Sequence, residues 1–325
     1  MHIGWKAWIA RLQLIALAVL PLAHADAKPG GDSVVDVSLA TATPGGGFQL
    51  YGAQFAEVLN AAGEGWRIEP VASRGSRENL QLLDQGRVDL ALVEGNAARQ
   101  VLEDPAQQAH GLRILSVMYP NPGLFAVSGD SPHRSIDDLR GRPIAFGTRA
   151  SGLRILARDV LDGLGLTSDG DFVELILDKA AEGPRLVLSG RADALWGAGI
   201  AWPGFVRLAD SATGARFIAP TGAQIEAILK RHPHLRRMSV PAGTYRGQTQ
   251  SIESVGLWSL ILTRADLPDD LAYRLAEAIH RHQGTLAQRF AQGRYTSAEN
   301  TVQQVDPGRL HPGAARYYRS AGLLQ

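Results

Sequence analysis

The sequence predicts an α/β protein built from two similar lobes with a ligand cleft between them. The first observation is a repeated unit, in which a leucine-rich helical stretch is followed by Gly-Arg-x-Asp and an apolar strand. Its glycines, Gly86 and Gly190, are 104 positions apart, and each suits the left-handed residue that ends a helix. The second observation is that a strand, a Gly-rich turn and a helix precede both copies in the same register.

The first lobe is expected to begin with an alternating strand over residues 34–40. A helix over residues 48–62 follows, because its apolar side chains recur at helical spacing. Ser76 is well placed as the N-cap of the next helix. The remaining elements expected in this lobe are strands over residues 66–72, 88–93 and 112–118 and a short helix over 79–83.

The second lobe is expected to open on an N-capping box, in which Ser135 is followed by Asp138 three positions later. Its further elements are predicted as strands over 144–146, 172–177 and 194–196 and helices over 153–161 and 222–231. Two more helices are expected near the end of the chain, over 268–290 and about 312–321.

Two apolar segments, 123–127 and a single strand over 255–263, are the expected crossings between the lobes. The predicted lobes are therefore residues 26–122 with 257–325, and residues 123–256. Two crossings make a hinge rather than a flexible tether.

The first 25 residues have the pattern of a secretory signal peptide. Lys6 and Arg11 form a basic region, an apolar run of 11 residues from Leu12 to Leu22 follows, and 23–25 read Ala-His-Ala. The run is too short to cross a bilayer. We expect cleavage after Ala25, which leaves 300 residues in the periplasm.

Composition excludes several classes of protein. The predicted mature chain has 31 basic and 32 acidic residues, whereas a nucleic-acid-binding protein needs a basic face. The sequence contains no cysteine, and therefore neither a disulfide nor a thiol nucleophile. A chain of this length and balance suits a soluble receptor, for which we expect a monomer with no cofactor.

The two Gly-rich turns, 43–47 and 147–152, are candidate binding positions. Each joins the carboxyl end of a strand to the start of a helix, where backbone N–H groups are unpaired and the helix dipole favours an anion. Two such turns facing each other across a cleft predict a site for a carboxylate or phosphate group.

The serines and histidines that could serve in catalysis have simpler structural explanations. The sequence has no G-x-S-x-G, and Ser76 and Ser151 read as a helix cap and a turn donor. His280 and His282 point to different faces of a helix, and we expect His232 with His234 to have no partner cluster of acids or further histidines. We therefore expect neither an enzyme nor a metal site.

Six segments, in order along nearly the whole chain, resemble the TAXI-type solute receptors of TRAP transporters. They read TPGGGFQLYG at 43–52, SRGSRENL at 73–80, DLALV at 89–93, DLRGR at 138–142, VPAGTY at 240–245 and HPGAARYY at 311–318. Each match alone is short, and it is their common order and spacing that carries the resemblance.

The resemblance implies a two-lobed, type II periplasmic binding-protein fold. It also implies capture of a small organic acid, often a carboxylate or an acidic amino acid, for a sodium-driven membrane permease. The implied ligand contacts in the first lobe are Gly46, Gly47, Phe48, Tyr51, Ser76, Asn79 and Glu94. Those in the second lobe are Thr148, Ser151 and Gly152, with Trp196 as an apolar wall.

Two departures from the family pattern bear on the ligand. Phe48 stands where a tyrosine is usual, and Glu94-Gly95-Asn96 replaces a Gln-x-Asp pattern. A carboxylate facing the cleft repels an acid but suits an α-amino group, so we predict an amino acid or another zwitterion. Arg149, in the second turn, is a candidate bidentate partner for the ligand carboxylate.

Three hypotheses of function follow from the sequence. The leading one is a periplasmic receptor that closes on its ligand and delivers it to a TRAP permease. The second is a sensor of the same fold that presents its closed form to a membrane partner. The third is a periplasmic hydrolase or lyase acting in the cleft.

Overall fold

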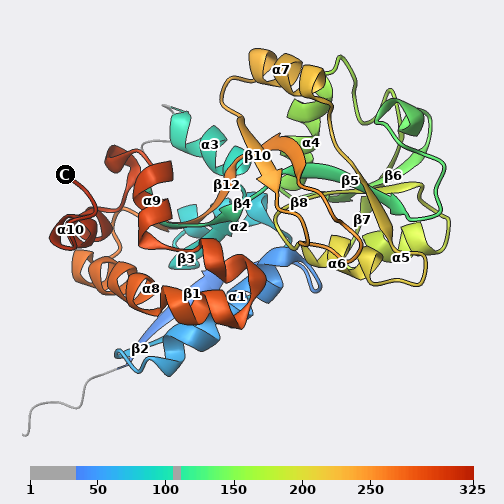
Figure 1. Cartoon of the computed structure of the whole chain (residues 1–325). Coiled ribbons are helices and arrows are strands. Elements are labelled where there is room, and N and C mark those ends of the chain that lie inside the picture. The colour runs from blue at the N-terminus through green and yellow to red at the C-terminus, as the bar shows by residue number, and fades with distance from the viewer. Residues whose placement is uncertain (1–33, 105–110) are drawn as a thin grey trace, which may run out of the picture. The chain divides into compact units, whose positions relative to one another are not determined.

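The computed structural model describes residues 34–104 and 111–325, which form two five-stranded mixed sheets with helices packed against them (Figure 1). The predicted signal peptide lies outside the described residues. Within residues 34–104 and 111–325, no helix combines the length and hydrophobicity needed to cross a membrane.

The first sheet has the strand order β2-β1-β3-β12-β4. Its strands are β1 (Val35–Ala40), β2 (Trp66–Val71), β3 (Leu90–Val93), β4 (Leu112–Pro120) and β12 (Trp258–Arg264). β1 runs parallel to β2 and β3, and β12 runs antiparallel to β3 and β4. Every residue of β3 is buried, as expected of a central strand covered on both faces.

The second sheet repeats this topology in the order β7-β6-β8-β5-β9. Its strands are β5 (Gly123–Ser128), β6 (Pro143–Thr148), β7 (Val173–Leu177), β8 (Ala194–Ala198) and β9 (Ala215–Ile218). β6 is parallel to β7 and β8, and β5 is antiparallel to β8 and β9. In each sheet the antiparallel strand, β12 or β5, is the one that enters from the other lobe.

The repeated glycines end helices in both lobes, as predicted. Gly86 and Gly190 have φ angles of 66° and 71°, in the left-handed region. After the first glycine, the N–H of Arg87 donates to the carbonyl of Leu82 at 2.9 Å. After the second, the N–H of Arg191 donates to the carbonyl of Leu186, also at 2.9 Å. The repeat is therefore the same capped helix-to-strand turn, built twice.

Ten α-helices are described, with three short 3₁₀ turns. The α-helices are α1 (Gly47–Ala61), α2 (Ser76–Asp84), α3 (Gly95–Glu103), α4 (Leu153–Asp162), α5 (Glu182–Leu188), α6 (Pro203–Ala209), α7 (Gly222–Arg231), α8 (Asp269–Arg289), α9 (Ala298–Gln304) and α10 (Pro312–Ser320). The 3₁₀ turns are Asp137–Leu139, Ala291–Tyr295 and Pro307–Arg309. The long α8 packs against α1 and α10, and these three helices lie side by side in Figure 1.

The predicted capping box of the second lobe is present, although it caps only a 3₁₀ turn. The N–H of Ser135 donates to Asp138 Oδ2 at 2.9 Å, and the N–H of Asp138 donates to Ser135 Oγ at 3.2 Å. Helices α3, α6 and α9 and strands β9 and β10 (Arg236–Val240) were not predicted. They span four to nine residues, too few for a clear periodic pattern.

The second crossing corrects the predicted single strand over residues 255–263. The chain forms β11 (Ile252–Gly256), paired only with β10, and then β12, with Leu257 between them. A Cβ at Gly256 would lie 1.9 Å from the carbonyl oxygen of Asn121, so the two crossings touch at this point. Asn121 also donates its N–H to Leu257 O at 3.0 Å, which interrupts the strand.

Candidate functional site

A pocket lies between the two lobes, at the carboxyl ends of strands from both sheets. Its cavity volume, counted as the space that the centre of a water molecule can occupy, is about 70 Å³. One water molecule needs roughly 10–15 Å³ by the same measure, so the cavity is several times larger. From the first lobe and its crossing, Ala42, Thr43, Gly46, Gly47, Phe48, Arg74, Gly75, Ser76, Glu94, Tyr119 and Asn121 line it. From the second, Gly147, Thr148, Ser151, Gly152, Leu153, Leu177, Ala180, Trp196, Ala198 and Trp202 line it.

Hydrogen bonds join the two lobes around this pocket. The N–H of Ala180 donates to Thr43 Oγ1 at 3.2 Å, and the N–H of Arg77 donates to Ala150 O at 3.2 Å. Thr148 Oγ1 donates to the carbonyl of Arg74 at 3.3 Å. In the described structure these contacts bring the two lobes together around the pocket.

Three helices that begin at the pocket have a glycine at the N-cap position, although at α4 the N–H of Leu153 donates to Ser151 Oγ at 3.2 Å. Their N-cap residues are glycines, Gly46 for α1, Gly75 for α2 and Gly152 for α4, and none of them has a side chain to accept a backbone N–H. The partial positive ends of three helix dipoles therefore converge on one cavity, which favours an anionic group there. This is the arrangement that the two Gly-rich turns predicted, with α2 added.

Ser76 is not the N-cap of α2, contrary to the prediction. The helix begins at Ser76 itself, and the preceding Gly75 has a φ of 123°, a conformation that favours glycine. The hydroxyl of Ser76 instead accepts the N–H of Glu94 at 3.1 Å. Ser76 thus fixes the end of β3 at the pocket wall.

Glu94 is a buried carboxyl group at the start of α3, with 1% of its surface exposed. Its Oε2 accepts the N–H groups of Asn96 and Ala97, at 3.0 and 3.3 Å, and its Oε1 accepts Asn96 Nδ2 at 3.2 Å. Among the described residues no cation pairs with it. Burial therefore raises the pKa of Glu94 to about 8, and the negative charge of Asp159 adds to the increase.

The space in front of α1 is bounded by two aromatic side chains that carry polar groups. A Cβ at Gly47 would lie 3.0 Å from Trp202 Cδ1, 3.2 Å from Trp202 Nε1 and 3.2 Å from Tyr119 Oη. Tyr119 and Trp202 both line the pocket, so the hydroxyl of one and the indole N–H of the other are candidate contacts for a ligand. The Tyr119 ring also packs edge-on against Phe48 at 6.4 Å.

Nine of the twelve predicted contacts line the pocket. They are Gly46, Gly47, Phe48, Ser76, Glu94, Thr148, Ser151, Gly152 and Trp196. Trp196 forms a fixed wall, because its Nε1 donates to Leu153 O at 2.8 Å and its ring packs against Phe125. Whether these nine residues bind a ligand remains a prediction.

The other three predicted residues lie elsewhere. Tyr51 is in the core of the first lobe, where its hydroxyl bonds Thr296 Oγ1 at 2.8 Å. Asn79 is fully buried, donates to the carbonyls of Thr41 and Leu92 at 2.7 Å each, and does not line the pocket. Arg149 is exposed and does not line the pocket.

Sequence reasoning did not name Tyr119, Asn121, Trp202 or Arg74 among the ligand contacts, although it interpreted Trp202 as either core or cleft wall. The first two end β4 or follow it, and Trp202 follows β8, so position at a strand's carboxyl end was the one available signal. Arg74 is the cationic side chain at the pocket, and it pairs with Glu78 at 3.1 Å.

The histidine pair after α7 has acidic neighbours, contrary to the expectation from sequence. His234 Nε2 lies 3.2 Å from Asp159 Oδ2, and His232 Nε2 lies 2.8 Å from Asp162 Oδ2. Both aspartates belong to α4, about 70 positions earlier in the chain. Packing of α4 against α7 brings them together, which no local pattern reveals.

Comparison with known proteins identifies a family and a fold. A model of the NMT1-like family matches residues 39–322. A structure from Bordetella bronchiseptica RB50 aligns with a TM-score of 0.53 and 17% identity, covering 90% of this chain and 82% of the other. The alkanesulfonate-binding protein SsuA from Xanthomonas axonopodis pv. citri, bound to MOPS, aligns at 0.49 and 18%, covering 90% and 84%.

A Xanthomonas citri protein bound to ATP aligns with a TM-score of 0.48 and 15% identity, covering 89% of this chain and 99% of the other. At these identities the likeness concerns the fold alone. The two mixed sheets form two lobes, as the sequence predicted, and the Bordetella bronchiseptica structure shares this fold.

Proposed function

Because this chain belongs to the NMT1-like family and has a pocket between two lobes, we propose that it is a solute-binding receptor of a transporter. The observation that carries the proposal is that the pocket walls come from both lobes, which touch through direct hydrogen bonds around it. A solute that contacts both walls only in the closed form shifts the population towards that form. The closed form is then what the transporter recognises.

The ligand that suits this pocket is a small carboxylate with an amino group, such as a glutamate-like amino acid. The N-termini of α1 and α4, at Gly47 and Gly152, supply backbone N–H groups for the carboxylate. The Glu94 carboxyl lies beside Gly152, and it is the partner that we assign to the ammonium group of the solute. Phe48 and Trp202 enclose the apolar part of the solute.

The resemblance to TAXI-type receptors supports a TRAP permease as the partner and the periplasm as the compartment. The arrangement of neighbouring genes tests this part of the proposal. A TRAP permease gene beside this one supports delivery to that permease. A gene for a membrane sensor kinase in that place instead supports the signalling hypothesis.

Thermal unfolding against a panel of solutes tests capture directly. The panel includes L-glutamate, L-glutamine, 2-oxoglutarate and succinate. A ligand at a thousandfold excess over its dissociation constant adds about 4 kcal/mol to the free energy of unfolding, a shift of several degrees at this size. We expect one amino acid to give that shift and to be recovered unchanged. Recovery of a converted product would favour the hydrolase hypothesis.

Glu94→Gln tests the preference for a zwitterion. The substitution keeps the side-chain size but removes the negative charge that an ammonium group would meet. We expect amino acids to lose affinity relative to the keto acid and the dicarboxylic acid in the same panel. An unchanged ranking of these solutes would contradict the role given to Glu94 while leaving the receptor function intact.

A further inference from the structure

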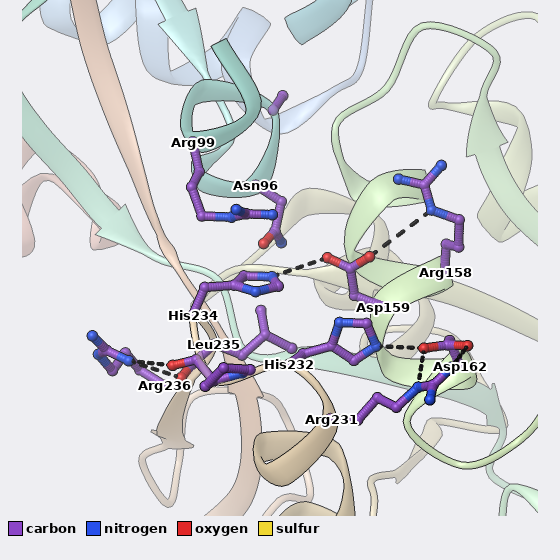
Figure 2. Close-up of polar contacts among 12 residues, drawn as sticks. Asn96, Arg99, Arg158, Asp159, Asp162, Arg231, His232, His234, Leu235 and Arg236 are labelled. Atoms are coloured by element: carbon purple, nitrogen blue, oxygen red, sulfur yellow. Dashed lines mark hydrogen bonds and ion pairs between the residues drawn. The ribbon is translucent and has the colours of Figure 1, made fainter. Parts of the chain in front are cut away.

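A cluster of one carboxylate and two imidazoles lies outside the pocket, between α4 and the segment after α7 (Figure 2). Asp159, His232 and His234 each offer one ligand atom, and these atoms lie within 4.8 Å of one another. Asp159 is buried, with 8% of its surface exposed, and both histidines are half-buried.

We propose that Asp159, His232 and His234 bind a divalent transition-metal ion of the zinc type. Two ligands at about 2.0–2.1 Å from a tetrahedral ion are separated by roughly 3.3 Å. His234 Nε2 and Asp159 Oδ2 are already 3.2 Å apart, so an ion fits between them with little movement. Imidazole nitrogens and one carboxylate are the donor set that zinc prefers, and three protein ligands leave one position open.

Asp162 supplies the outer support that such a site requires. A histidine that ligates a metal generally uses its second ring nitrogen to bond a carboxylate, which fixes the ring. His232 Nε2 lies 2.8 Å from Asp162 Oδ2, which leaves Nδ1 for the metal. Figure 2 shows this second aspartate on the far side of the His232 ring from His234.

Asn96, on α3 of the first lobe, is the independent observation that points to a missing partner. It is fully buried, and its Oδ1 has no hydrogen-bond partner among the described residues. Figure 2 shows its amide beside the ring of His234, towards the cluster. A metal ion, or a water molecule bound to one, would satisfy this oxygen, and a buried polar atom without a partner is costly.

Three arginines act against a cation at this position. Arg158 Nε lies 3.9 Å from Asp159 Oδ1, Arg231 bonds Asp162, and Arg99 lies beside His234. The side chains of Arg158 and Arg231 are 59% and 65% exposed, so both can turn into water when an ion binds. Their presence predicts a site of moderate affinity rather than a permanently loaded one.

Cobalt titration of the purified, untagged protein tests the site, because tetrahedral Co²⁺ has a characteristic visible spectrum that surface binding does not give. We expect one equivalent of Co²⁺ to bind with that spectrum and to be displaced by Zn²⁺. His234→Ala and Asp159→Asn should each weaken binding at least about 100-fold, and Asp162→Asn about 10- to 100-fold. His282→Ala, on the surface of α8, is the matched control and should leave binding unchanged.

Two results would overturn the proposal. One is that the wild-type protein binds no stoichiometric Co²⁺ or Zn²⁺ at micromolar concentrations. The other is that His234→Ala binds as well as the His282→Ala control. Circular dichroism of each variant shows that it is folded, and Asp162→Asn keeps all three ligands, so its loss of affinity separates a metal site from general damage.

Discussion

Glu94 is the residue whose chemistry depends most on the fold. Its carboxyl group caps α3 through two backbone N–H groups, yet it is buried against Gly152 of the other lobe with no cation beside it in residues 34–104 and 111–325. The pKa of about 8 means that the group is mostly protonated at neutral pH in the unliganded pocket. An ammonium group on the ligand would lower the pKa of Glu94 and favour its ionised carboxylate, because the two charges are opposite.

The raised pKa predicts how stability depends on pH. Between pH 4.5 and about 8 the folded protein binds a proton at Glu94 that the unfolded chain has lost. The free energy of unfolding therefore falls as pH rises through this window, with a slope of up to about 1.4 kcal/mol per pH unit from this group. Glu94→Gln should remove this contribution, which denaturant unfolding at several pH values measures.

Glu253→Gln, at an exposed position on β11, provides the control for that measurement. It removes a carboxylate without touching the pocket and should retain the wild-type slope. If Glu94→Gln and Glu253→Gln gave the same pH dependence, the burial of a protonated Glu94 would be refuted.

At the scale of elements, the N-terminus of α4 packs directly on the end of β3 and the start of α2. A Cβ at Gly152 would lie 2.6 Å from Glu94 Cβ and 2.8 Å from Ser76 Oγ, both in the first lobe. The backbone of Gly152 is itself helical, with a φ of −63°, so alanine strains only the contact between lobes. This glycine is needed for closure rather than for the turn.

Gly152→Ala should therefore weaken solute binding by about 5- to 150-fold, because overpacking costs about 1–3 kcal/mol and is present only in the closed form. If the unliganded protein is open, its free energy of unfolding should change by less than about 1 kcal/mol. Gly284→Ala, at an open position in α8, is the control. It should leave binding unchanged and stabilise the helix by about 0.5–1 kcal/mol. Equal affinities of the two variants would show that the lobes do not close at Gly152.

Local patterns predicted most of the elements, since caps, turns and periodic helices depend on neighbouring residues. Gly86, Gly190 and the Ser135 box were found in this way, and so were the two Gly-rich turns at the pocket. The predictions that failed concern features that depend on contacts between distant segments of the chain. The break at Leu257 arises from Asn121, the acidic partners of His232 come from α4, and Tyr119 and Trp202 reach the pocket only when both lobes are assembled.

At the scale of the whole two-lobed unit, the two crossings are tied to each other. Asn121 Nδ2 donates to Leu257 O at 3.2 Å and to Ser259 Oγ at 2.6 Å, and Asn121 also lines the pocket. One side chain therefore contacts both crossings and the ligand cavity. We infer that the crossings bend together, as a single hinge, when the lobes close.

Small-angle X-ray scattering tests this motion. We expect a solute identified by thermal unfolding to lower the radius of gyration of the wild-type protein, because it bridges both lobes and shifts the population to the closed form. Gly152→Ala should show a smaller decrease at saturating solute, since its closed form is strained, whereas Gly284→Ala should match the wild type. A radius of gyration that the solute leaves unchanged in all three proteins would mean that the unliganded molecule is already closed. In that case the differences in affinity would arise from the pocket alone, and the hinge at Asn121 would have no part in capture.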